Sequence, residues 1–243
     1  MHLSWIIPAY NEERRIGKTV REVHQYLQSK QISDGYEIIV VDSSSKDRTY
    51  EIAEGLRSSI AELKILRVVN KGKGYAVREG MFFAHGDIRL FSDADNSTPP
   101  ESFDRMEPLF REGYDVVISS RNPRDVPGAT RDVKEPWYRE VLGTVGNVII
   151  QSVGVWGIWD TQNGFKAVTA ASAKKIFSRM RIQEFAFDVE MLALARKMNC
   201  KIGIVPIRWR FDPDSKVTAV AYLRFFADVF RIRWNFLTGI YKM

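Results

Sequence analysis

The amino-acid sequence predicts an α/β fold, a doubly wound and mostly parallel sheet flanked by helices. Short apolar runs alternate three times with segments of helical periodicity before residue 88, which is the pattern of strand–helix–strand units with parallel strands. The chain has 243 residues and is 45% hydrophobic, enough for the core of one such domain. We expect this domain to cover residues 1–218 and a C-terminal amphipathic helix to cover residues 219–243.

The first half of the chain supplies regular strand and helix units. The expected strands are the apolar runs at residues 3–7, 36–41 and 64–69. The helices between them carry apolar stripes at helical spacing, from Ile16 to Leu27 and from Ile52 to Leu63. A third helix is expected after the loop at residues 70–74, and a fourth apolar run ends at Ser92.

The second half is less regular. Residues 116–121 have the pattern of a strand that ends in an arginine, and residues 122–136 form a polar loop of the kind that carries function. The remaining expected elements are one helix at 141–159, a loop at 160–164 leading to a strand, helices at 171–180 and 184–198, and a half-exposed strand at 205–211.

The C-terminal segment, residues 219–241, has the pattern of an apolar helix with one narrow polar stripe. The stripe consists of Arg224, Asp228, Arg231, Asn235 and Thr238. Two interpretations stay open. Either the helix is largely buried against the domain, or its aromatic-rich face rests at a membrane interface where arginine and lysine meet lipid headgroups.

Two aspartates follow the fourth apolar run, at Asp93 and Asp95. Strand residues two positions apart share a face, so both carboxylates can converge on one hard cation. Mg²⁺ and Mn²⁺ suit oxygen ligands and keep open positions for substrate phosphates. The alternative is that the two aspartates only belong to a loop.

In a doubly wound sheet, ligands bind beyond the carboxyl ends of the strands. The polar residues in the loops after the expected strands are Tyr10, Asn11, Glu12, Asp42, Lys71, Lys73, Asp93 and Asp95. This convergence predicts a nucleotide-type site. The loop at residues 70–74 is a simple turn or a place where lysines meet a diphosphate, and Asp42 caps a helix or accepts hydrogen bonds from a base or ribose.

The net charge of +6 suits a nucleic acid, a phosphate-bearing substrate or an anionic membrane. The chain has neither a lysine/arginine block nor a known nucleic-acid motif, so we expect no nucleic-acid partner. The single cysteine, Cys200, excludes an intramolecular disulfide. We expect no signal peptide and no transmembrane helix.

Motifs along nearly the whole chain resemble those of one family. They are Ile7-Pro8-Ala9-Tyr10-Asn11-Glu12, Val40-Val41-Asp42, Asn70-Lys71-Gly72-Lys73-Gly74, Asp93-Ala94-Asp95 with Thr98-Pro99-Pro100, Ser120-Arg121, Trp137-Tyr138-Arg139, Asp160-Thr161-Gln162-Asn163-Gly164-Phe165-Lys166, Phe185-Ala186-Phe187-Asp188-Val189-Glu190 and Ser215-Lys216. The chain resembles the inverting family-2 glycosyltransferases of GT-A fold. Within them it is similar to the polyprenyl-phosphate sugar synthases, particularly the dolichyl-phosphate β-glucosyltransferases.

Two departures from the family pattern concern the donor side and the membrane. The relatives usually have two aspartates and then Gly-Ser where this chain has Asp42-Ser43-Ser44-Ser45. Relatives also carry an N-terminal anchor or C-terminal membrane spans, which we do not expect here. Membrane attachment would then depend on the C-terminal helix or on a partner.

The resemblance implies metal-dependent transfer of a hexose, glucose from UDP-glucose, to a polyprenyl or dolichyl phosphate with inversion. The donor-binding residues are then Pro8, Ala9, Tyr10, Glu12, Asp42, Lys73, Asp93, Ala94 and Asp95, with Mg²⁺ or Mn²⁺ on Asp93 and Asp95. The acceptor-phosphate residues are Arg121, Arg131, Ser215 and Lys216, and the catalytic candidates are Asp160, Arg121 and Asp188. The two aspartates bind sugar hydroxyls, or one of them, with Asp160 favoured, assists as a base.

Three other functions stay open from the sequence. These are a GDP-mannose-dependent polyprenyl-phosphate mannosyltransferase, a sugar nucleotidyltransferase and a non-catalytic membrane-binding module. The intact pair Asp93 and Asp95 argues against the last. We expect a peripheral protein at the cytoplasmic face of a membrane, and a membrane-anchored partner or a homo-oligomer.

Overall fold

The computed structural model describes residues 1–30, 32, 34–69, 72–131, 146–151, 153, 155–209 and 219–241. The strands are β1 (Leu3–Ala9), β2 (Tyr36–Asp42), β3 (Leu63–Arg67), β4 (Ile88–Ser92), β5 (Val116–Ser120), β6 (Thr130–Arg131), β7 (Phe165–Thr169), β8 (Ile202–Pro206) and β9 (Arg208–Trp209). The helices are α1 (Ile16–Lys30), α2 (Thr49–Leu56), α3 (Lys73–Phe83), the 3-10 turn η1 (Pro100–Ser102), α4 (Phe103–Arg111), α6 (Ala170–Phe177), α7 (Phe187–Lys197) and α8 (Ala219–Leu237). Residues 146–151 are helical as well.

The central sheet has seven strands in the order β3-β2-β1-β4-β7-β5-β8, and β6 pairs with β9 separately. The pairings β1–β2, β1–β4, β2–β3 and β5–β8 are parallel, whereas β7 runs antiparallel to β4 and to β5. The strand order reverses between β1 and β4, which is where ligands bind in open sheets of this kind. The expected mostly parallel α/β sheet is therefore confirmed.

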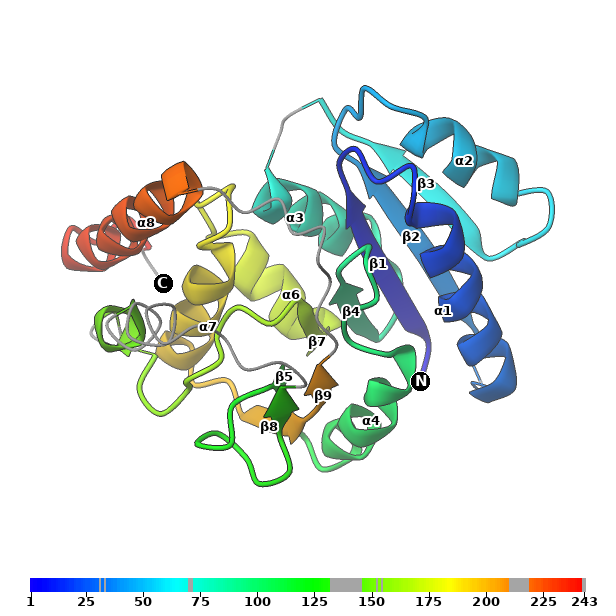
Figure 1. Ribbon diagram of the computed structural model, residues 1–243. Coiled ribbons are helices and arrows are strands. Elements are labelled where there is room, and N and C mark those ends of the chain that lie inside the picture. The colour runs from blue at the N-terminus through cyan, green and yellow to red at the C-terminus, as the bar shows by residue number, and fades with distance from the viewer. Residues whose placement is uncertain are drawn as a thin grey trace.

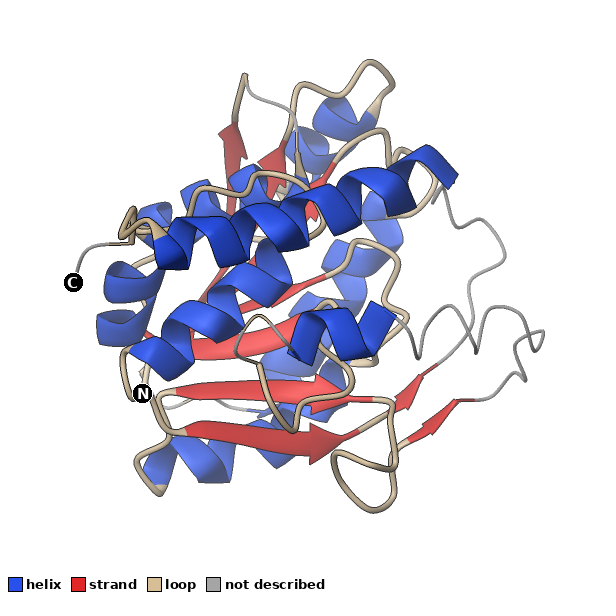
Figure 2. Ribbon diagram, turned by 90° about the vertical axis from the view of Figure 1, so that its left-hand side faces the viewer, coloured by secondary structure: helices blue, strands red, loops and turns tan. Residues whose placement is uncertain are grey.

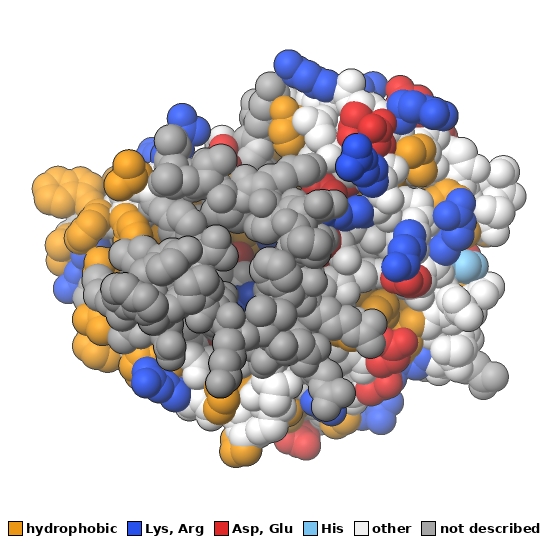
Figure 3. Space-filling view, in the orientation of Figure 1, with side chains coloured by type: hydrophobic (Ala, Val, Ile, Leu, Met, Phe, Trp, Pro, Cys, Tyr) orange, Lys and Arg blue, Asp and Glu red, His pale blue; other side chains and the backbone are white. Residues whose placement is uncertain are grey.

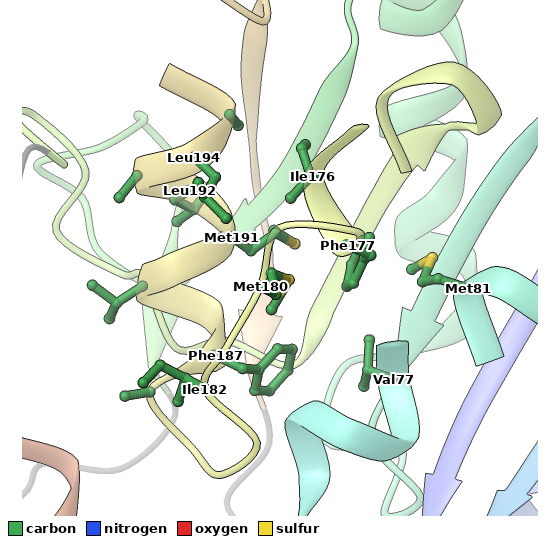
Figure 4. Close-up of a cluster of buried hydrophobic side chains, with 14 of the residues drawn as sticks. Val77, Met81, Ile176, Phe177, Met180, Ile182, Phe187, Met191, Leu192 and Leu194 are labelled. Atoms are coloured by element: carbon green, nitrogen blue, oxygen red, sulfur yellow. The ribbon is translucent and has the colours of Figure 1, made fainter. Parts of the chain in front are cut away.

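Helices cover both faces of the sheet (Figure 1). Along β1 the side chains alternate, so that Trp5 and Ile7 belong to one core cluster and Ile6 to the other. The first cluster includes apolar side chains of α1, α2 and α4, and the second includes those of α3, α6, α7 and α8. Figure 4 shows the second cluster, in which Val77, Phe177 and Phe187 come from three different helices. Each face of the sheet therefore has its own core.

The expected single helix at residues 141–159 is wrong. Residues 146–151 are helical, and the chain then turns at residues 156–157. Gly157 adopts a φ of 73°, which glycine reaches without strain, and its N–H donates to the Gln151 side chain at 2.9 Å. The described helix therefore ends before this turn and does not reach Trp159. Residues 132–145 lie outside the described part of the chain.

The other expected elements of the second half are present, with shifted ends. The helices expected at 171–180 and 184–198 are α6 and α7. The strand expected at 205–211 is divided between β8, which ends at Pro206, and the two residues of β9. The Ile207 N–H donates to the Ser120 carbonyl of β5 at 3.1 Å, and the Ile207 carbonyl accepts from the Thr130 N–H at 3.1 Å, so the chain changes its pairing partner from β5 to β6 at Ile207.

Helix α8 packs against α7 and forms the outer layer of one side of the molecule (Figure 2). It ends at Leu237, and in the turn that follows, Gly239 has a φ of 71° and the Ile240 N–H donates to the Asn235 carbonyl at 3.0 Å. This turn returns Tyr241 to the core, where its hydroxyl donates to the buried carboxylate of Glu190 in α7. Among the described residues, no helix combines the length and apolar character needed to span a membrane.

Candidate active site

The loops that follow β1 and β2 are hydrogen-bonded to each other. The N–H groups of Asn11 and Glu12 donate to Ser45 Oγ at 3.0 Å and to Thr49 Oγ1 at 2.7 Å. In return, the Lys46 N–H donates to Asn11 Oδ1 at 2.8 Å. Pro8 and Ala9 end β1 directly before this loop, and the Tyr10 side chain is 41% exposed beside it. The expected base-binding segment is therefore a fixed rim with an aromatic ring at its surface.

Asp42 ends β2 and is fully buried. Its Oδ1 accepts a hydrogen bond from the Ser45 N–H at 3.2 Å, and Arg67 Nε lies 3.3 Å from its Oδ2. Within the described residues, Oδ2 accepts no hydrogen bond. A buried carboxylate oxygen without a donor is costly, so this atom has acceptor capacity for a ligand N–H or O–H group.

Asp93, Ala94 and Asp95 follow β4 at the same edge of the sheet. The Asp93 N–H donates to the Gly164 carbonyl at 3.1 Å, which joins this turn to the start of β7. A Cβ atom on Gly164 would lie 2.2 Å from Asp93 Oδ2, so only glycine permits this approach. Thr19 in α1 donates to the Ala94 carbonyl at 2.6 Å and supports the turn from the other side.

The charges around Asp93 are coupled. Lys73 Nζ lies 2.5 Å from Asp93 Oδ1. Burial favours the neutral amine of Lys73, but the carboxylates of Asp93 and Asp188 raise its pKa above the ordinary value. Burial also raises the pKa of Asp95, and the negative charge of Asp93 raises it further. Two carboxylates that repel each other in a partly buried site gain from a cation between them.

The donor set fits a divalent cation with open positions. Within the described residues, no group of three or more His, Cys, Asp or Glu side chains could hold a metal ion. Asp93 and Asp95 would supply two carboxylate ligands, and phosphate oxygens and water would complete the coordination, as Mg²⁺ and Mn²⁺ allow. Burial, and next the negative charge of Asp93, raise the pKa of Asp95, and a bound cation would favour its ionised form.

Arg121 and Asp160 form a rigid pair at the end of β5. The backbone N–H and Nε of Arg121 donate to Asp160 Oδ2 at 2.7 and 2.8 Å, and Nη2 donates to Oδ1 at 2.7 Å. The loop is fixed in turn by Asp125, which accepts hydrogen bonds from the N–H groups of Trp159 at 2.6 Å and of Asp160 at 2.8 Å. Arg121 is therefore held in one orientation, with its side chain 19% exposed.

Asp188 lies in the first turn of α7 and pairs with Lys166 of β7 at 2.6 Å. Both side chains are buried. Burial raises the pKa of Asp188, which the positive charges of Lys166 and Lys73 oppose, and burial lowers the pKa of Lys166. Lys166 also donates to the Asn163 carbonyl. A continuous set of charges thus runs from Lys73 and Asp93 through Asp188 and Lys166 to the pair of Arg121 and Asp160.

The structure brings most of the expected site residues to one edge of the sheet. The donor-side residues follow β1, β2 and β4 or begin α3, while Arg121, Asp160 and Asp188 lie on the side of β5 and β7. The side chain of Arg131 in β6 and residues Lys71, Ser215 and Lys216 lie outside the described part, so their expected contacts stay predictions.

Sequence reasoning gave no role to Lys166 or Asp125, although both organise the site. Lys166 stands in an apolar strand, Phe165-Lys166-Ala167-Val168, where a charged residue at a buried position indicates a partner. That signal was available from the sequence. The position of Asp125, five residues after Ser120, carried no comparable pattern.

The fold and this edge define a class: an α/β protein whose charged side chains gather where the strand order of a mostly parallel sheet reverses. Comparison with known proteins agrees. A family model described as glycosyl transferase family 2 matches residues 4–177. The chain belongs to this family, and its fold is the GT-A fold expected from the sequence.

Curated relatives and solved structures extend over nearly the whole chain. A dolichyl-phosphate beta-glucosyltransferase of Dictyostelium discoideum is 33% identical over 257 residues, covering 100% of this chain and 77% of the relative. The Homo sapiens protein of that description is 31% identical, covering 99% and 78%. The Mycobacterium tuberculosis glucosyl-3-phosphoglycerate synthase, solved with Mn²⁺, UDP and phosphoglyceric acid, has a TM-score of 0.68 at 19% identity and covers 99% of this chain and 78% of that one.

Proposed function

We propose that the chain transfers glucose from UDP-glucose to a polyprenyl or dolichyl phosphate, with inversion at the anomeric carbon. The relatives described as dolichyl-phosphate beta-glucosyltransferases match the chain over its full length and support this acceptor class. The observation that carries the proposal is the charged edge of the sheet. A carboxylate pair with a lysine lies on the donor side, and a rigid arginine lies on the opposite side.

On the donor side, Asp93 and Asp95 would hold Mg²⁺ or Mn²⁺ against the diphosphate. The ion would neutralise the charge that develops on the leaving nucleotide. Lys73 adds positive charge at the same place, since its raised pKa keeps it protonated. The free acceptor capacity of Asp42 Oδ2 and the rim formed by residues 8–12 are suited to the ribose and base.

On the acceptor side, the nucleophile is a phosphate that is already ionised near neutral pH, so it needs little help from a base. It needs cations that overcome repulsion from the donor diphosphate. Arg121 supplies one in a fixed geometry, and Arg131, Ser215 and Lys216 are the further proposed contacts. Asp160 then acts by orienting Arg121, and Asp188 by balancing Lys166 and Lys73, with sugar hydroxyls as additional partners.

We also propose that this transfer takes place at the cytoplasmic face of a membrane, with the chain bound peripherally. The acceptor class supports the membrane location, because the hydrocarbon tail of a polyprenyl phosphate partitions into the bilayer. A membrane-anchored partner or a second copy of the chain would serve the same purpose.

Calorimetric titration with UDP-glucose and with GDP-mannose, each with and without Mn²⁺, tests the donor. We expect metal-dependent binding of UDP-glucose alone. Preference for GDP-mannose would identify the chain as a mannosyltransferase instead of a glucosyltransferase. Release of pyrophosphate from a nucleoside triphosphate and a sugar phosphate would instead identify a nucleotidyltransferase, and binding of neither donor would contradict the proposal.

Arg121→Ala tests the acceptor side. The loss of a charged, bidentate phosphate contact is expected to lower the transfer rate about 10- to 100-fold while donor binding is retained. Arg111→Ala on α4 is the matched control, because its guanidinium pairs only on the surface with Glu107 at 2.6 Å. Transfer by Arg121→Ala at the wild-type rate, with unchanged acceptor affinity, would exclude the acceptor role.

A further inference from the structure

Helix α8 has two apolar faces, of which only one packs on the domain. The packed face contains Phe225, Val229 and Ile232, which are between 0% and 7% exposed. The opposite face carries Leu223, Phe230, Trp234 and Leu237, which are between 62% and 73% exposed. These four residues lie at i, i+7, i+11 and i+14, so they form one straight row along the helix. We call this row the outer stripe of α8.

Arginines border the outer stripe on both sides. Arg224 and Arg231 lie about a quarter turn to one side of the row and Arg233 about a quarter turn to the other. All three are exposed. The one acidic residue of the helix, Asp228, is half-buried on the domain side, where burial raises its pKa and Arg231 opposes the rise. The exposed face of α8 between residues 223 and 237 therefore carries positive charge and no exposed carboxylate among its described side chains.

The apolar surface continues onto the neighbouring segment. A Cβ atom on Gly146 would lie 3.2 Å from Phe226 of α8, so the helix at residues 146–151 lies beside α8. Val148 on this helix and Trp156 in the turn after it are 60% and 64% exposed. Figure 3 shows hydrophobic side chains gathered at the end of the molecule where α8 lies, with basic side chains among them. An apolar surface of this extent, with two tryptophans, is unusual on a protein without a partner.

We propose that the outer stripe of α8, with Val148 and Trp156, docks on an anionic lipid bilayer, with the helix lying in the plane of the interface. The row of Phe, Trp and Leu side chains is suited to the boundary between headgroups and acyl chains, and the flanking arginines are suited to anionic headgroups. A second copy is a poorer occupant. A symmetric contact through this face would bring arginines together without carboxylates to pair with them.

This inference deepens the proposed function and rests on it for the identity of the lipid acceptor. Helix α8 packs on α7, and the first turn of α7 contains Asp188 of the charged edge. The link runs through buried groups, since Glu190 of α7 accepts the hydroxyl hydrogen bond of Tyr241, which follows α8. Docking through α8 would therefore fix the position of the active edge relative to the bilayer from which the acceptor phosphate is taken.

Vesicle flotation of the full chain, without donor or acceptor, tests the docking surface. We expect binding to phosphatidylcholine vesicles that contain phosphatidylglycerol, weaker binding to phosphatidylcholine alone, and weakening by salt. Replacing Phe230 and Trp234 by serine is expected to lower the partition coefficient about tenfold or more, because both rings leave the acyl boundary. Replacing Arg224, Arg231 and Arg233 by glutamine should lower binding to the anionic vesicles about fivefold per arginine and leave binding to neutral vesicles nearly unchanged.

Two control variants match these changes. Phe82→Ser replaces a ring of α3 that is 42% exposed, and Arg111→Gln removes an exposed guanidinium of α4. Both should float like wild type. Circular dichroism and melting temperature should be unchanged in the α8 variants, since the replaced side chains are exposed. The proposal would be overturned if the α8 variants and the control variants floated equally. It would also be overturned if the wild-type chain did not bind vesicles and sedimented as a dimer, and if F230S/W234S dissociated that dimer.

The two proposals fail in distinguishable ways. Transfer to a short-chain polyprenyl phosphate that is soluble in detergent needs no docking, so the α8 variants should retain it and lose only transfer to acceptor embedded in vesicles. Vesicle binding without transfer in either assay would contradict the proposed function alone. Transfer to vesicle-embedded acceptor that is insensitive to the α8 variants would contradict the docking alone.

Discussion

The carboxylate of Glu37 and those of Asp95 and Asp188 lie at opposite ends of the central sheet, and their surroundings differ. Glu37, at the start of β2, accepts hydrogen bonds from the His85 N–H at 2.6 Å, Lys64 Nζ at 2.7 Å and Ser4 Oγ at 2.5 Å. Although burial raises its pKa, these donors lower it to about 2. At the other end, the pKa values of Asp95 and Asp188 are raised.

This difference separates a structural charge from a functional one. Donors of the protein itself satisfy the hydrogen-bonding capacity of the Glu37 carboxylate, so the folded state stabilises its ionised form. Asp95 and Asp188 have less positive charge around them than their burial requires. In our proposal a cation and the donor bind beside Asp95 and Asp188 and stabilise their negative charge. Without these ligands the ionised carboxylates are unfavourable in the folded protein.

The largest effect is expected from Lys166→Met. Removing the partner of a buried carboxylate leaves Asp188 uncompensated and should lower the free energy of unfolding by about 3–5 kcal/mol in urea titrations. The double variant Lys166→Met/Asp188→Leu should recover most of this stability and remain without transfer activity. A double variant as unstable as the single one would show that the pair is not the source of the loss.

Asp93→Asn is expected to act on transfer and hardly on stability. The loss of one carboxylate of the cation site should reduce the transfer rate about 100- to 1000-fold. The melting temperature should stay near that of wild type, because two effects of the substitution offset each other. The repulsion between residues 93 and 95 is relieved, and the ion pair of Lys73 with Asp93 is lost. Glu54→Gln, a surface change on α2, serves as the control. If Asp93→Asn transferred at the wild-type rate in the presence of Mn²⁺, Asp93 would not be part of the cation site.

Glu37→Gln tests the other end of the sheet. The carboxylate contributes stability fully above its ordinary pKa of 4.5, and this contribution is lost as pH falls through the folded-state value of about 2. We expect the variant to be less stable than wild type by about 1–3 kcal/mol at pH 7, allowing for screening of the half-exposed Lys64. The two unfolding free energies should approach each other as the pH is lowered. A difference that is constant with pH would refute the assignment.

The smallest effect is expected from Tyr241→Phe, at a third buried carboxylate. Glu190 would keep the N–H donors of Arg181 at 2.9 Å and Ile182 at 2.8 Å and lose only the phenol hydroxyl. Urea unfolding should show a loss of about 1–2 kcal/mol. Glu190→Gln, which leaves one oxygen acceptor for these donors, is the comparison variant. A Tyr241→Phe loss as large as that of Lys166→Met would mean that Glu190 depends on this hydroxyl as Asp188 depends on Lys166.

The donor side of the sheet could be predicted from the sequence because its signals are local. Each polar residue there is the last residue of a strand or the first residue after it, since Asp42 ends β2 and Asp93 follows β4. The pairing of β7 between β4 and β5 is a contact between distant segments, and no local pattern encodes it. The close approach of Gly164 to Asp93 follows from that pairing, so it emerged only from the structure, as did the identity of the partner of Lys166.

The faces of α8 could not be assigned from the sequence for a different reason. The sequence left two interpretations open, and the structure buries Asn235 of the polar stripe and exposes Phe230 and Trp234. Apolar residues occupy both faces of the helix, and periodicity alone cannot say which of two apolar faces packs on the domain. The core contacts of Val229 and Ile232 decide it.

The antiparallel strand β7 has a consequence for the order of synthesis. Strands β5 and β8 join the sheet only through β7, and β7 is translated after β5. A nascent chain that has reached residue 160 can form β1 to β4, but the edge of β4 that β7 later covers is still open. Open strand edges invite pairing with other chains. The interval between the emergence of β4 and that of β7 from the ribosome is therefore the stage at which protection by a chaperone matters most.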